Sequence, residues 1–162
     1  MSIKIFCDIA DLNLIRKFNK KKIVKGFTTN PSLMRKAGAR NYELYSKEIL
    51  KVCKNKPISF EVFADDYENI LRQALKIKSW GKNVFVKIPV INTKGIFLKN
   101  IIKELNLNNV KINITAVFTL KQILKIKKQI NKKTPVIISI FCGRIADSGI
   151  DPEPIIIRAK KE

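Results

Sequence analysis

The chain has 162 residues, about the length of one domain, and 46% of them are hydrophobic, which is enough to bury a core. Its 33 basic residues outnumber 13 acidic ones and give a formal net charge of +20. The lysines are spread along the chain between apolar residues, without an arginine-rich cluster or a ladder of aromatic residues, so we do not expect nucleic-acid binding as the main function.

Histidine is absent, which excludes Ser-His-Asp and Cys-His catalysis and histidine metal sites. The three cysteines, Cys7, Cys53 and Cys142, show no C-x-x-C spacing, so we expect a reducing, cytoplasmic setting. The amino terminus lacks the long apolar region of a signal peptide, and the longest apolar run is too short to span a bilayer. We therefore expect no membrane partner and catalysis by Lys, Asp, Glu, Tyr, Ser or Thr.

Short strand-like runs alternate with helical patterns from end to end. The predicted strands cover residues 3–8, 23–27, 57–63, 83–90, 110–118 and 134–142. Between them, segments such as 41–53, 65–80 and 119–130 place apolar residues three and four apart. This repeating unit predicts parallel strands with helical crossovers, and no linker interrupts it. We therefore predict a single domain over residues 1–162.

Strand parity gives each predicted strand one apolar face and one face that turns polar toward the carboxyl end. The polar residues concerned are Asp8, Asn30, Ser59, Glu61, Lys87, Asn113, Thr115 and Ser139. Polar residues delivered by all six strands to one end predict a parallel α/β barrel with its site at the carboxyl-terminal face. A doubly wound open sheet is the alternative, but it gathers its ligand at a single crevice.

The stretch "NVFVKIPV" places Lys87 among Val, Phe, Ile and Pro. Burial disfavours the charged form of a lysine, and a neutral amine is a nucleophile for carbonyl carbon. Glu61 and Asp8 could supply the proton transfers that Schiff-base formation and carbon–carbon cleavage require. The alternative is structural: Lys87 extends to solvent at the strand end or pairs with Glu61.

Two further candidates also have structural alternatives. Asn30 before Pro31 is typical of a helix start, with Asn as the N-cap. Arg144, just past the sixth predicted strand, could bind a phosphate or could form a salt bridge with Asp147. No Gly-rich nucleotide loop is present, so nicotinamide and ATP chemistry are not expected.

Six stretches of the chain resemble, in order, the strand motifs of the transaldolase family, which includes short-type transaldolases and fructose-6-phosphate aldolases. They are "IFCDIADLNLIRK", "GFTTNPSLM", "SFEVFAD", "VFVKIPV", "NITAVFTLKQ" and "ISIFCGRIADSGIDP". The resemblance covers essentially the whole chain and implies a TIM-type (β/α)8 barrel. It also implies an enzyme that needs no metal and no organic cofactor.

Residue by residue, the resemblance implies that Lys87 forms the Schiff base with the ketose carbonyl. Asp8 matches the acid/base group, and Glu61 with Thr115 matches the pair that positions the catalytic water. The implied reaction moves a dihydroxyacetone unit between sugar phosphates in the pentose phosphate pathway.

The resemblance also implies substrate contacts. The matching residues are Asn30, Asn113 and Ser139 for the hydroxyls of the dihydroxyacetone unit, and Arg144 for a phosphate. Glu61 and Phe141 resemble the transaldolase branch, because the aldolase branch typically has Gln and Tyr at these places. A fructose-6-phosphate aldolase-like lyase is the alternative activity.

The last residues, "DPEPIIIRAKKE", match the start of the helix after the sixth strand. A closed barrel of this type needs eight strands and at least about 200 residues. We therefore expect about six of the eight βα units and an open edge. A fragment, a disrupted gene, a second chain that supplies the missing strands, and self-association are the possible explanations. An inactive remnant and a basic polyanion-binding module are the alternatives to a working enzyme.

Overall fold

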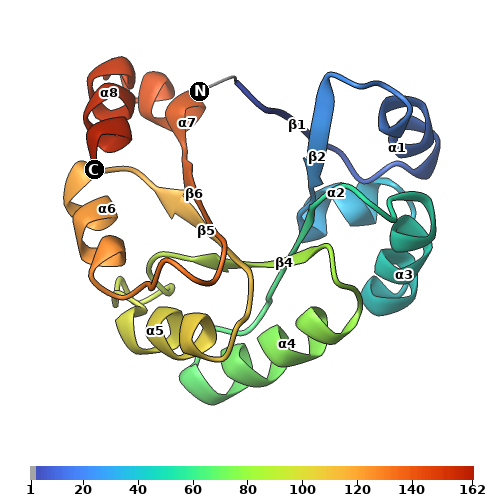
Figure 1. Cartoon of the computed structure of the whole chain (residues 1–162), viewed down its shortest axis with the longest axis horizontal. Coiled ribbons are helices and arrows are strands. Elements are labelled where there is room, and N and C mark those ends of the chain that lie inside the picture. Colours follow the sequence, from blue (N-terminus) through green and yellow to red (C-terminus); the bar gives the residue numbers. More distant parts are fainter. Residues whose placement is uncertain (1–2) are drawn as a thin grey trace.

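The computed structural model describes residues 3–162, which form one six-stranded sheet curled into a half-barrel with helices on its outer side (Figure 1). All neighbouring strands are parallel and follow each other in chain order, so β1 and β6 are the two edges. The strands are β1 (Ile5–Asp8), β2 (Val24–Thr28), β3 (Ile58–Glu61), β4 (Val84–Pro89), β5 (Ile112–Val117) and β6 (Val136–Ile140). The prediction of an incomplete TIM-type barrel is confirmed.

Helices follow each strand. They are α1 (Leu12–Asn19), α2 (Pro31–Lys36), α3 (Tyr42–Val52), α4 (Tyr67–Ser79), α5 (Lys99–Leu107), α6 (Leu120–Lys127), α7 (Cys142–Asp147) and α8 (Glu153–Lys161). Five of them begin with a side chain that accepts a hydrogen bond from the backbone N–H three residues on, as expected for N-caps. The capping residues are Asp11, Asn30, Asn41, Asp66 and Thr119.

Five of the six observed strands are shorter than the predicted ones, and β2 has the predicted length but begins and ends one residue later. The sixth prediction, 134–142, extended too far, because the chain turns at Phe141 and Cys142 already begins α7. In the fifth strand, Ala116 has a φ of 56°, and the pairing with β6 shifts register between Ile114 and Val117. A left-handed residue of this kind interrupts regular strand pairing.

The outward face of the sheet packs on the helices and carries the core. Phe27, Phe60, Val86, Ile88 and Ile114 have no exposed surface. At 25 cal/mol per Å² of buried apolar surface, each such side chain stabilises the fold by roughly 1.5–3 kcal/mol. This layer fixes the direction of the strands and therefore of the alternate residues on the concave face.

The concave face lines an open cavity of about 640 Å³, whose lining includes Phe85, Asn113 and Ser139. Phe6 lies directly over Gly26 in the neighbouring strand: a Cβ added there would lie 2.2 Å from the Phe6 ring. A side chain at position 26 would therefore require the Phe6 ring to move. The Phe6 ring also lines the cavity.

Candidate active site at the carboxyl ends of the strands

Lys87 lies near the carboxyl end of β4 and is only 8% exposed. Its Nζ is 3.3 Å from Oε2 of Glu61, which is its register neighbour on β3, and donates a hydrogen bond to the Thr29 carbonyl at 3.3 Å. The side chain of Glu61 is 23% exposed. Lys87 is therefore held inside the half-barrel with one charged and one neutral oxygen partner, and the ion pair raised from the sequence is present.

A chain of three polar side chains crosses the concave face beside Lys87. Asn113, the register neighbour of Lys87 on β5, is fully buried. Its Nδ2 donates to Ser59 Oγ at 3.0 Å, and its Oδ1 accepts from Ser139 Oγ at 2.7 Å. A buried amide satisfied at both ends has a fixed orientation. The structure thus brings Asn113 and Ser139 together, as sequence parity predicted.

Thr115 is 2% exposed, and its Oγ1 has no hydrogen-bond partner among the described residues. A buried hydroxyl without a partner costs roughly 1–3 kcal/mol, so such groups are typically satisfied by an ordered water or a ligand. The donor capacity of Thr115 is thus available to a small polar molecule.

Asp8 and Asn30 lie at the carboxyl ends of the first two strands. Asp8 is exposed at the end of the edge strand β1, where Oδ1 accepts from Thr28 Oγ1 at 2.8 Å. Asn30 caps α2 by accepting a hydrogen bond from the Leu33 N–H at 2.9 Å. The capping interpretation of Asn30 is confirmed, and its Nδ2 donors are not used by that bond.

Phe141 and Arg144 lie beyond the other edge strand. The Phe141 ring packs edge-on against Phe118, with centroids 5.7 Å apart. Arg144 is exposed on α7 and lines a hollow of about 410 Å³ that also includes Asp147. Within residues 3–162 the salt bridge between Arg144 and Asp147, raised as an alternative from the sequence, is not formed. The guanidinium is thus open to solvent.

Tyr42 and Thr29 belong to this neighbourhood, although the sequence analysis did not single them out. Tyr42 Oη accepts from the Glu61 N–H at 2.8 Å and donates to the Glu61 carbonyl at 3.0 Å. The pKa of Tyr42 is raised far above its ordinary value, mainly by burial, so the phenol stays protonated. Thr29, fully buried, supplies the carbonyl that contacts Lys87. In the sequence, the only indication that Thr29 lies near the site is its position beside Asn30, in the stretch "TTN".

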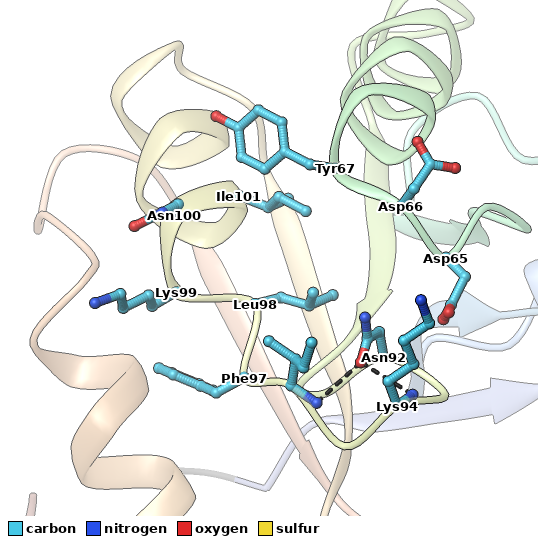
Figure 2. Close-up of a pocket in the computed structure, with 11 residues that line it drawn as sticks. Asp65, Asp66, Tyr67, Asn92, Lys94, Phe97, Leu98, Lys99, Asn100 and Ile101 are labelled. Atoms are coloured by element: carbon cyan, nitrogen blue, oxygen red, sulfur yellow. Dashed lines mark hydrogen bonds between the residues drawn. The ribbon is translucent and has the colours of Figure 1, made fainter.

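A separate pocket of about 480 Å³ lies between the amino ends of α4 and α5 (Figure 2). Its floor is the loop around Asn92, whose Oδ1 accepts from the N–H groups of Lys94 and Ile96. Two carboxylates, Asp65 and Asp66, face it together with two lysines, so its charge favours neither anions nor cations. None of the predicted site residues lines this pocket.

Two properties of the described region concern other kinds of partner. Across residues 3–162, no group of three or more His, Cys, Asp or Glu side chains is arranged to hold a metal ion. No helix in the same range has the length and apolar character that crossing a bilayer requires.

Comparison with known proteins supports one family. The family model described as transaldolase/fructose-6-phosphate aldolase matches residues 5–161. A probable transaldolase of Streptococcus equi subsp. zooepidemicus is 36% identical over 154 residues, which are 95% of this chain and 67% of the relative. Probable transaldolases of Methanococcus vannielii and Herpetosiphon aurantiacus are 36% and 35% identical over 149 residues, covering 92% of this chain and 65% and 63% of those relatives.

The chain thus spans about two thirds of the length of these curated relatives. The match runs through all six strands and through the strand ends that carry Lys87, Glu61 and Asn113. The chain belongs to the transaldolase/fructose-6-phosphate aldolase family.

Proposed function

We propose that this chain carries the Schiff-base site of a transaldolase, which transfers a dihydroxyacetone unit between sugar phosphates. The pair of reactants is sedoheptulose 7-phosphate with glyceraldehyde 3-phosphate, and the products are erythrose 4-phosphate and fructose 6-phosphate. The carrying observation is Lys87, an amine buried on the concave face with Glu61 3.3 Å away. The names of the curated relatives support the same activity. The proposed setting is the pentose phosphate pathway in the cytoplasm.

The first half-reaction begins when the neutral amine of Lys87 adds to the C2 carbonyl of the ketose. The carbinolamine takes up one proton, delivered through Glu61, and loses water, which gives a protonated imine. Asp8 then takes the proton of the C4 hydroxyl. The C3–C4 bond breaks, the aldose leaves as an aldehyde, and the electron pair moves through C3 into the imine to give an enamine. The imine nitrogen acts as the electron sink, so the protein's own residues suffice for this step.

The second half-reaction reverses these steps with another aldose. The enamine C3 attacks the aldehyde carbon of the acceptor, and its oxygen takes the proton from Asp8. Water then adds to the imine and releases Lys87 and the new ketose. Glu61 and the unpaired hydroxyl of Thr115 are the proposed partners of this water.

The neighbouring polar residues fit a substrate with several hydroxyls and a phosphate. Asn30, Asn113 and Ser139 are the proposed contacts to the dihydroxyacetone unit. The exposed guanidinium of Arg144 is the proposed phosphate contact, because a planar fork of N–H donors matches phosphate oxygens. Phe141 is the proposed apolar neighbour of the bound sugar. The excess of basic residues favours the approach of anionic sugars.

A borohydride trapping experiment tests this proposal. Borohydride added with fructose 6-phosphate reduces the imine and leaves a stable sugar adduct on Lys87, which mass spectrometry locates. We expect the adduct to disappear in Lys87→Met and to persist in Lys103→Met, an exposed lysine on α5. Folded protein without an adduct on Lys87 would refute the function for this chain acting alone.

The aldolase-like lyase is distinguished by one substitution. We expect Glu61→Gln to weaken transfer to an added aldose relative to simple aldol chemistry with dihydroxyacetone. The ratio of the two rates is the measurement, and an unchanged ratio contradicts the transaldolase branch.

The sheet is open at its two edge strands, β1 and β6. β1 and β6 have unpaired backbone groups along their outer sides, and unpaired edges bind other strands. We propose that further strands close the sheet between β1 and β6, supplied by a continuation of the same polypeptide, by a second polypeptide or by a copy of the chain. Size-exclusion chromatography with light scattering shows whether the chain self-associates or is a monomer. For a monomer, an activity assay with and without the second polypeptide tests whether that polypeptide completes the site.

A further inference from the structure

The pairing of β2 with β3 stops at the level of the candidate site. These strands pair at Phe27 with Ile58 and at Thr28 with Ser59, and the last bond runs from the Thr29 N–H to the Ser59 carbonyl at 3.1 Å. In a regular parallel ladder, the next bond would run from the Glu61 N–H to the Thr29 carbonyl. Here the Glu61 N–H bonds to the Tyr42 hydroxyl, and the Thr29 carbonyl bonds to Lys87. Two side-chain bonds thus replace the next bond of the ladder.

The phenol of Tyr42 replaces the missing strand partner of Glu61. One hydroxyl accepts from the Glu61 N–H at 2.8 Å and donates to the Glu61 carbonyl at 3.0 Å. Tyr42 is the first residue of α3, and its ring packs edge-on against Phe63 with centroids 4.5 Å apart. Because burial keeps the phenol protonated, it can donate and accept at the same time. Both polar backbone groups of Glu61 on this side are thereby satisfied.

This substitution has a consequence for Lys87. The Thr29 carbonyl, which the regular ladder would use for Glu61, accepts from Lys87 Nζ at 3.3 Å instead. The Glu61 carboxylate, on the residue that the phenol holds, lies 3.3 Å from the same Nζ. Both oxygen partners of Lys87 thus lie where the phenol takes the place of strand pairing.

We propose that Tyr42 is a positioning residue for Lys87: its hydroxyl separates the ends of β2 and β3, holds Glu61 toward the amine and leaves the Thr29 carbonyl free to orient it. Tyr42 does not touch the reacting atoms in this role. Its catalytic consequence rests on the proposed function, whereas its effect on the Lys87 amine does not.

Tyr42→Phe removes the hydroxyl, and the same helix offers a matched control. Tyr45 is also partly buried on α3, and its hydroxyl lies near two backbone carbonyls, those of Ala10 at 3.1 Å and Ala37 at 3.3 Å. Neither carbonyl contacts Lys87 or Glu61. Both substitutions lower the melting temperature by removing a buried hydrogen bond, so a purely structural role predicts the same behaviour for both.

The first measurement does not require activity. The protein is labelled with acetic anhydride over a range of pH, and mass spectrometry follows acetylation of Lys87. We expect the midpoint of Lys87 labelling to move to lower pH by about half a unit or more in Tyr42→Phe, because a less well held carboxylate stabilises the ammonium less. The midpoint in Tyr45→Phe is expected to match that of the unmodified protein. Equal midpoints in all three proteins overturn the proposal.

The second measurement is the rate of borohydride trapping with fructose 6-phosphate at saturating sugar. We expect Tyr42→Phe to lower this rate about tenfold, with little change in the sugar concentration for half-maximal rate, since the sugar does not contact Tyr42. An equal loss in Tyr45→Phe contradicts the proposal. Absence of trapping in the unmodified protein refutes the proposed function, and the labelling midpoint then still decides the role of Tyr42.

A second variant covers the case in which Tyr42→Phe does not fold. Phe63, the ring that seats Tyr42, is 57% exposed, so Phe63→Ala preserves the core and loosens the phenol without deleting it. We expect a smaller shift of the Lys87 midpoint in the same direction. An unmoved midpoint in folded Phe63→Ala overturns the proposal.

Discussion

The middle of the sheet and its two edges hold their polar residues differently. On β3, β4 and β5, Lys87 and Asn113 are buried, and each is bonded to partners on neighbouring elements. At the edges, Asp8 is exposed at the end of β1, and Arg144 is exposed beyond β6. Lys87 and Asn113 are thus fixed by buried contacts, whereas Asp8 and Arg144 reach solvent. Lys87, the residue proposed to form the imine, thus lies in the middle, and Asp8 and Arg144, proposed for proton transfer at C4 and for phosphate binding, lie at the edges.

The largest expected contrast is in packing. Ile88→Ala, in the middle, removes a side chain with no exposed surface and should lower the free energy of unfolding by about 2–5 kcal/mol. Ile5→Ala, on β1, truncates a residue that is 43% exposed and should cost less than about 1 kcal/mol. Urea unfolding of both variants measures the difference. Similar costs would show that the edge is covered in solution.

The reactivity of the three cysteines tests the same difference between the buried middle and the exposed edges. Burial raises the pKa of the Cys53 thiol to about 11, whereas Cys7 on β1 and Cys142 on α7 are partly exposed. At pH 8 we expect a thiol reagent to modify Cys53 at least about a hundredfold more slowly, because less thiolate forms and the reagent has no access. Peptide mapping after timed labelling gives the three rates. Rapid modification of Cys53 would mean that the middle opens readily.

The hydrogen-bonded chain through Asn113 provides a finer comparison. Asn113→Ala deprives both Ser59 and Ser139 of their partner and should cost about 1–3 kcal/mol. Ser139→Ala, on the edge strand, removes one bond and leaves Asn113 Oδ1 without its donor, but both residues line the cavity, where water can replace the hydroxyl, so the cost should be about 1 kcal/mol. Chemical denaturation tests the order, and a larger cost for Ser139→Ala would contradict it.

The smallest expected effect is on thermal stability as the pH is lowered. Hydrogen bonds from Lys47 and Lys76 lower the pKa of Glu43, on the outer helices, below its ordinary value of 4.5. A lowered folded-state pKa stabilises the fold above the ordinary value, and this contribution is lost as the pH falls through the folded value. Glu43→Gln should therefore melt slightly below the unmodified protein at pH 7 and together with it at pH 2. Glu48→Gln, with a single exposed lysine partner, is the control.

Sequence reasoning recovered the strands because each alternates a wholly apolar face with a polar one, as at Phe60 beside Ser59 and Glu61. The same parity placed Lys87, Asn113 and Ser139 on one concave face. It missed Tyr42 because an aromatic at the start of an amphipathic helix looks like ordinary core, and its role depends on where two strands stop pairing. The bond from Asn113 to Ser59 passes over β4 and depends on the curvature of the sheet, which periodicity does not encode.

The strand order of the sheet is identical to the order along the chain, so each unit docks only on the one made just before it. The units can then dock one after another along the chain, because every strand pairs with its neighbour in sequence and only short loops have to close. The registers that set Lys87 beside Glu61 and Asn113 involve only β3, β4 and β5, which lie within one continuous stretch, residues 58–117. Since Thr29 and Tyr42 precede this stretch, every described partner of the amine is in place once the fifth strand has docked, before β6 is added.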